Sequence, residues 1–245
     1  MKKKNKIVPI LLVVLLVGLV VGANVWRSHS VVRDVRVDID YQDADTLVGA
    51  DEVKVLITTA LPALFTTRVS DVDLAAVEKA AARSPYLTDC QAGTSIGGAV
   101  VLYAVQQRPI VRVMVGGTEY YLSDTRHKLP VTKTGNSDVI VAGGNIPDKG
   151  KELDDVWKLA DYLDRNPDYG VLFDQIYRDA KGDLFLTPKV GSHVVQVGSP
   201  ADLDEKFRNL MVFYTRGLPQ AGWDTYSQVS VKFRGQVVAT KRNKH

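Results

Sequence analysis

Residues 226–240, YSQVSVKFRGQVVAT, decide how the C-terminal part of the chain is expected to fold. From Val229 to Phe233, apolar and polar residues alternate, and a period of two places every second side chain on one face of a β-strand. The Arg-Gly pair that ends at Gly235 is a turn signal, which leaves residues 236–240 as a second short strand. The stretch therefore predicts a β-hairpin at the end of a sheet.

Upstream of this hairpin, short aromatic or β-branched runs alternate with glycine-rich turns, which predicts a mostly antiparallel sheet over residues 106–240. Two amphipathic helices are expected within it, at residues 151–167 and 199–217. Ser199 is expected to cap the second helix and Gly217 to end it.

A different pattern occupies residues 31–105. An alternating run at 31–40 predicts a strand, and helical spacing predicts helices at 50–61 and 70–84, the second of which ends before Pro85. Strand-like segments broken by glycines follow. The expected order is strand, helix, helix, strand, strand.

The first 26 residues combine a basic end with a long apolar run. Four lysines precede Ile7, and no charged residue occurs in the twenty residues from Ile7 through Trp26. As a helix this run rises about 30 Å, the thickness of a bilayer's hydrocarbon core. The pattern predicts a transmembrane helix with the N-terminus inside and the bulk outside. A cleaved signal peptide is the alternative, because small residues at 21–23 suit a signal peptidase.

Charge and composition exclude several classes of function. Lys and Arg total 31, and seven of them lie at the two ends, so 24 basic residues in the body face 28 acidic ones. A nucleic-acid-binding domain usually shows the opposite balance. Cys90 is the single cysteine, which excludes an intramolecular disulfide and a cysteine-based zinc site, and we expect it to be buried. The histidines show no metal-ligand spacing, so no cofactor or metal is expected.

The residues that suggest catalysis have simpler explanations. The carboxylates of the helix at 151–167 lie on its polar side, which predicts a solvated face rather than a glycosidase pair. Ser123, Asp124 and His127 resemble a catalytic triad only in composition, and a turn with a polar network accounts for them. The paired glycines fit strand turns better than phosphate loops. The chain is therefore not expected to be an enzyme.

Six short motifs follow one another in a distinctive order. They are SPYL at 84–87, QQRPIVRV at 106–113, YYLSD at 120–124, VGSHVVQVG at 190–198, KFRNLMVFY at 206–214 and GWDTYSQVSVKFRGQVV at 222–238. In this order, and over nearly the whole chain, they resemble the bacterial cell-division family FtsQ, also called DivIB.

The resemblance implies an α+β chain with an N-terminal transmembrane helix, a POTRA domain of β-α-α-β-β order and a mostly antiparallel β domain with two helices. The implied bounds are 1–6 for a cytoplasmic tail, 7–26 for the transmembrane helix, 31–105 for the POTRA domain, 106–240 for the β domain and 241–245 for a basic tail. It further implies a non-catalytic divisome scaffold in the inner membrane at the septum, with its bulk in the periplasm, that helps control septal peptidoglycan synthesis.

The resemblance also implies a way of binding partners. FtsB- and FtsL-like single-span coiled-coil proteins are expected to add a β-strand to the open edge of the last strands, and the POTRA domain is expected to contact other membrane division proteins. The expected partner-binding residues are Tyr226, Lys232, Phe233, Arg234, Gln236, Val237, Val238 and Ala239.

Three alternatives stay open from the sequence. The last strand can be internal and paired on both sides, in which case its apolar residues belong to a core. A POTRA-containing module for outer-membrane assembly or transport is the second alternative, and an exported hydrolase is the third.

Overall fold

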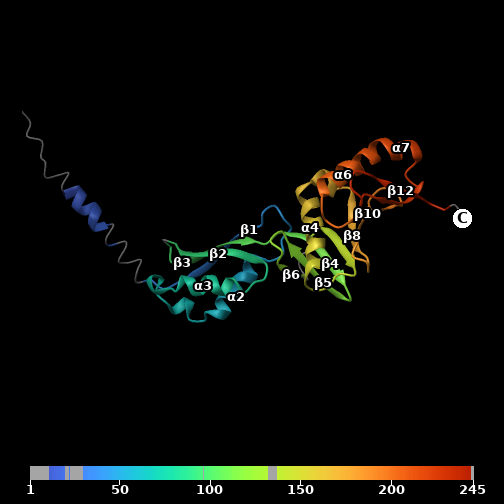
Figure 1. Ribbon diagram of the computed structural model, residues 1–245. Helices are drawn as coiled ribbons and strands as arrows, with labels where there is room; N and C mark the ends of the chain where they lie inside the picture. The colour runs from blue at the N-terminus through green and yellow to red at the C-terminus, as the bar shows by residue number, and fades with distance from the viewer. Residues whose placement is uncertain (1–10, 20–21, 23–29, 96, 132–136, 244–245) are drawn as a thin grey trace, which may run out of the picture. The chain divides into compact units, whose positions relative to one another are not determined.

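The computed structural model describes residues 11–19, 22, 30–95, 97–131 and 137–243. The protein is α+β, and its chain divides into two compact units, Met1–Gln106 and Gln107–His245. Each unit contains one sheet (Figure 1).

Residues 30–106 of the first unit form a three-stranded sheet and two α-helices, as far as the structure describes them. Its elements are β1 (Asp34–Asp40), α2 (Ala50–Ala60), the 3-10 turns η1 (Leu64–Thr66) and η2 (Val69–Asp71), α3 (Leu74–Ala81), β2 (Leu87–Thr94) and β3 (Ala99–Gln106). The strand order is β1-β3-β2, with β3 parallel to β1 and antiparallel to β2.

Helices α2 and α3 lie on one side of this sheet (Figure 1). Val53 and Ile57 of α2 and Val77 of α3 are fully buried, because helical spacing gathers them on the faces toward the sheet. Asp73 caps α3 by accepting a hydrogen bond from the Ala76 N–H at 3.0 Å.

The second unit is built on a nine-stranded sheet. Its strands are β4 (Pro109–Val115), β5 (Thr118–Ser123), β6 (Lys128–Pro130), β7 (Ile140–Gly144), β8 (Phe173–Arg178), β9 (Leu184–Pro188), β10 (Val194–Gly198), β11 (Tyr226–Ser230) and β12 (Val238–Lys241). Its helices are α4 (Lys151–Arg165), α5 (Pro167–Gly170), α6 (Leu203–Val212), the π-helical turn η3 (Phe213–Gly217) and α7 (Leu218–Ala221). The strand order is β12-β11-β10-β9-β8-β7-β4-β5-β6.

The described strands of the second unit form a mixed sheet, with five antiparallel and three parallel pairings, and the sequence did not indicate the parallel ones. β4 pairs with β7, β7 with β8 and β10 with β11 in parallel. The physical reason lies in the connections. Parallel neighbours need a crossover, and α4 with α5 joins β7 to β8 while α6, η3 and α7 join β10 to β11. The helices thus determine the strand directions instead of merely interrupting a meander.

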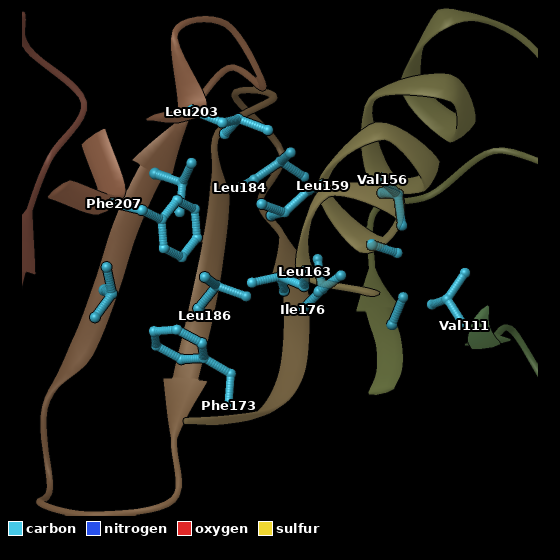
Figure 2. Close-up of a cluster of buried hydrophobic side chains, with 14 of the residues drawn as sticks. Val111, Val156, Leu159, Leu163, Phe173, Ile176, Leu184, Leu186, Leu203 and Phe207 are labelled. Atoms are coloured by element: carbon cyan, nitrogen blue, oxygen red, sulfur yellow. The ribbon is translucent and has the colours of Figure 1, made fainter. Parts of the chain in front are cut away.

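The core of the second unit lies between α4, α6 and the middle strands. Val156, Leu159 and Leu163 project from α4 toward Ile176 and Leu184 of the sheet, as Figure 2 shows. All five side chains are 3% exposed or less. This apolar layer fixes the helices on one face of the sheet.

The predicted transmembrane helix over residues 7–26 requires a correction. Within this stretch the structure describes residues 11–19 and 22, and these are helical. In the part of the chain that the structure describes, no helix is both long and apolar enough to cross a membrane. The other residues of the stretch, including 21 and 23 of the alternative cleavage site, lie outside the described residues, as do residues 1–6 and 244–245.

Candidate functional site: an open sheet edge with a groove beside it

β12 forms one end of the nine-stranded sheet. Within the described residues it is hydrogen-bonded to β11 alone. Val238, Ala239 and Thr240 pair in antiparallel register with Ser230, Val229 and Gln228. One side of β12 is therefore paired, and its other side is an open edge.

The direction of the backbone groups on β12 follows from one hydrogen bond. The Arg242 N–H donates to the Thr225 carbonyl at 2.9 Å, so it points toward β11. Backbone groups alternate along an antiparallel strand, which makes those of Thr240 point the same way. Ala239 and Lys241 then direct their N–H and C=O groups away from the sheet. These four groups form the donor and acceptor pattern that an added strand needs.

The connection between β11 and β12 is longer than the sequence predicts. Alternation predicted that the first strand reaches Phe233 and that the second begins at Gln236. Instead, β11 ends at Ser230 and β12 begins at Val238, so residues 231–237 form the connection.

Contacts with α6 explain this longer connection. The Glu205 carboxylate accepts a hydrogen bond from the Gly235 N–H at 2.9 Å and forms an ion pair with Arg234 at 3.4 Å. Gly235 has φ +71°, a left-handed conformation that favours glycine, and this confirms the predicted turn. The turn is thus held against α6 and does not extend the hairpin.

A groove of about 480 Å³ runs between this connection and the helical layer. Val212, Phe213 and Gln220 line its helical side, and Gln236 and Val237 line the other. Val212 is 50% exposed, so the groove offers apolar surface beside the polar edge of β12.

Lys206 anchors α6 at the end of β10. Its side chain is 7% exposed, and its ammonium group donates to the carbonyls of Val197 at 2.9 Å and Ser199 at 2.7 Å. Burial lowers the pKa of Lys206, and Asp202 and Asp183 oppose that shift. The sequence did not single out this residue, because a lysine in an amphipathic helix is normally assigned to the polar face.

A buried polar contact holds the π-helical turn against the sheet. The His193 Nε2 lies 2.8 Å from the Tyr214 hydroxyl, and the Trp223 ring packs on Tyr214 at 5.5 Å. His193 is 2% exposed, and its Nδ1 has no hydrogen-bond partner within the described residues. Burial therefore lowers the pKa of His193, with Asp224 acting in the opposite sense.

This contact predicts that acid destabilises the second unit. Because the pKa of folded His193 is depressed, the unfolded chain binds more protons as the pH falls below about 6.5, and the stabilising contribution is lost progressively. Urea unfolding at pH 7.5 and pH 5 should show a smaller loss of stability in His193→Phe than in the wild type. Equal losses in both proteins would contradict this assignment. Tyr214→Phe keeps the imidazole and should retain the pH dependence.

Residues 108–240 match the protein-family model described as FtsQ/DivIB, C-terminal related. The chain belongs to this family. The match covers more than half of the sequence and includes every strand of the nine-stranded sheet except the last residue of β12. No curated protein matches the chain. The FtsQ/DivIB family consists of non-enzymatic scaffold proteins of the division site, which take part in divisome interactions.

Four of the eight predicted partner-binding residues of this FtsQ/DivIB-related chain lie at the edge. Val238 and Ala239 belong to β12, and Gln236 and Val237 precede it and line the groove. Val238 is 45% exposed, whereas Val237 packs against the core. Val238 is thus the apolar side chain that the edge presents to solvent.

The other four predicted residues lie elsewhere. Tyr226 begins β11, and its ring contacts Phe213 at 5.7 Å. Lys232 forms an ion pair with Asp183 at 2.8 Å, and Phe233 and Arg234 belong to the turn beside α6. Their role in binding stays a prediction, and Lys232, Phe233 and Arg234 lie in the connection between β11 and β12.

Two features of the site escaped the sequence reasoning. Lys241 closes β12 and directs backbone groups outward, although it was assigned to a basic tail. The groove depends on α6 continuing through η3 into α7, whereas Gly217 was predicted to end that helix. The helix also begins later than predicted, with Asp202 rather than Ser199 at its N-cap. The sequence does carry a signal for this continuation, because a proline such as Pro219 is well tolerated in the first turn of a helix that begins at Leu218.

The carboxylates of α4 are not simply solvated, which corrects the prediction for them. Asp164 accepts two hydrogen bonds from the Arg108 guanidinium, at 2.7 and 2.8 Å, and these raise the pKa of Arg108. The remaining pairs join Asp161 to Arg165, Asp154 to Arg126 and Asp155 to Lys158.

The residues around His127 form a polar turn, as predicted. The Ser123 hydroxyl accepts a hydrogen bond from the His127 N–H at 3.0 Å and donates to Gln107 at 3.1 Å. The His127 ring contacts Thr125 at 3.0 Å, and Asp124 pairs with Arg108.

The single cysteine, Cys90, is half-buried rather than fully buried, and burial raises the pKa of its thiol.

Proposed function

We propose that this protein is a non-catalytic divisome scaffold that binds a partner by adding a strand of that partner to β12. The observation that carries the proposal is the position of β12 at the end of the nine-stranded sheet, with one side open. The family's role in cell division supports the proposal, because the matched region 108–240 contains β12 up to Thr240.

The groove beside the edge supports a partner that is longer than one strand. An added strand satisfies the outward groups of Ala239 and Lys241, while apolar side chains that follow it can enter the groove at Val212 and Phe213. Arg216 also lines the groove, and Lys241 lies at the end of the strand, so acidic residues in the partner are favoured. We infer that FtsB- or FtsL-like coiled-coil proteins supply this strand.

For the first unit, we propose that residues 31–105 form a POTRA domain that contacts other division proteins. The support is the order β1, α2, α3, β2, β3 around a three-stranded sheet with both helices on one side. Residues 106–240 form the β domain in this proposal. The alternative, an outer-membrane assembly module, does not account for the family match over 108–240.

The proposed function predicts a division defect on depletion. Cells that lose this protein should continue to grow but fail to septate, and should become filaments. Phase-contrast measurement of cell length during depletion tests this, with a fluorescent fusion of the full chain expected at midcell. Normal cell length after complete depletion, checked by immunoblot, contradicts a role as scaffold for septal peptidoglycan synthesis.

A further inference from the structure

The sheet of the first unit has one open face. Helices α2 and α3 cover the face formed by Val35, Val100 and Leu102, all 1% exposed or less (Figure 1). The opposite face carries Tyr103 in the middle strand β3, and this large aromatic side chain is 57% exposed. The exposed face of this ring can attract a cation.

A hollow of about 280 Å³ lies beside the Tyr103 ring. The strand register places Asp38 of β1 directly opposite Tyr103 on one side and Gln91 of β2 opposite it on the other. Asp40 lies two residues beyond Asp38 on the same face, opposite Val105. The side chains around the ring therefore come from all three strands.

A β-bulge brings a third carboxylate to this hollow. The register of β2 shifts between Thr88 and Gln91, and Asp89 occupies the bulge with φ +48°. Cys90, the next residue, packs toward the core, whereas Asp89 lines the hollow with Asp38. Bulges redirect side chains at the cost of regular pairing, and here the redirected group is acidic.

No basic side chain within the described residues forms an ion pair with Asp38, Asp40 or Asp89. Arg36, on the same face of β1, lies 3.7 Å from Asp34. Residues 30–106 contain eleven Asp and Glu against six Lys and Arg, which gives this unit a net charge of −5. The negative charge of this face therefore favours a cationic ligand.

We propose that this face binds a basic peptide segment of a partner protein. An arginine side chain of the segment stacks on the Tyr103 ring, and its guanidinium donates to the carboxylates of Asp38 and Asp89. Arginine fits better than lysine, because its planar guanidinium can stack on an aromatic ring and bind carboxylates at the same time. This surface lies in the first unit and is independent of the β12 edge proposed to bind an added strand.

Fluorescence anisotropy tests the proposal with the full chain and dye-labelled peptides of alternating glycine and a charged residue. The arginine peptide should bind, and the glutamate peptide of equal length should not. Tyr103→Ala should weaken binding about threefold, the range of an exposed cation–π contact. The double variant Asp38→Asn with Asp89→Asn should weaken it by about tenfold, as the loss of two charge-assisted contacts predicts.

The matched control removes two exposed charges elsewhere in the same unit, through Asp43→Asn with Glu52→Gln, and should leave the affinity within about twofold. The proposal is overturned if this control weakens binding as much as the hollow variant, or if both peptides bind alike. Concentration-dependent self-association that Tyr103→Ala abolishes also overturns it, because a second copy then occupies the face. Ala239→Pro should not change the affinity for the peptide. A negative result for the first unit is therefore distinguishable from a negative result for the β12 edge.

Discussion

Replacing Ala239 with proline is expected to weaken the binding of an added strand by about tenfold or more without unfolding the protein. Proline removes the backbone N–H of residue 239, which points away from β11, and an edge strand tolerates proline when the missing N–H faces outward. One hydrogen bond is worth about 1 kcal/mol, and the partner's unpaired carbonyl costs about 1–3 kcal/mol more. Since about 1.4 kcal/mol corresponds to tenfold, the sum exceeds that factor. Titration of the purified full chain with an FtsB-like partner measures the effect.

Ala239→Ser is the matched control for this change. Serine keeps the N–H and the small side chain, so partner affinity should stay within about twofold of the wild type. If the proline and serine variants bind equally well while both remain folded by circular dichroism, the outer side of β12 is not the binding edge.

Phe207→Ala is expected to cost the second unit about 3–5 kcal/mol of stability, the usual range for a buried phenylalanine. Phe207 is 1% exposed. Its ring centroid lies 5.1 Å from that of Tyr162, 5.2 Å from that of Tyr169 and 6.1 Å from that of Phe173. A domain is stable by only about 5–15 kcal/mol, so this loss removes a large part of the total. Because α6 carries Glu205, which holds the turn before β12, partner binding should fall with it.

Val212→Ala on the same helical segment provides the comparison. Val212 is 50% exposed, so its truncation should change stability by about 0.5 kcal/mol or less. It lines the groove, and partner affinity should nevertheless decrease, by up to about tenfold if Val212 is an apolar anchor. Urea denaturation of both variants separates the two effects. Equal stability of Phe207→Ala and the wild type contradicts the placement of this ring in the core.

Strand and helix positions followed from local patterns, whereas strand directions did not. The period of two, the helical spacing of Val156, Ala160 and Leu163, and the turn at Gly235 are local properties, and the structure contains them. That β7 and β8 run in parallel depends on where the chain returns after α4, which no local pattern encodes. The mixed sheet therefore could not be read from alternation alone.

The sequence likewise predicted the candidate site only in part. The end of the chain indicated an edge strand, and β12 is one. The bounds of β11 and β12 differ from the predicted ones, because Glu205 contacts Gly235 and Arg234, which lie about thirty residues further along the chain. The groove needs the same kind of long-range information, since α7 and Val237 meet only in the folded chain.

Backbone hydrogen exchange at Ala239 and Lys241 tests the central claim most directly. In the free protein these outward amides should exchange rapidly, while the Thr240 amide, which faces β11, should be protected. Addition of the FtsB-like partner should slow exchange at residues 239 and 241 and leave residue 240 almost unchanged. Rapid exchange at both outward amides in a saturated complex would contradict strand addition at β12.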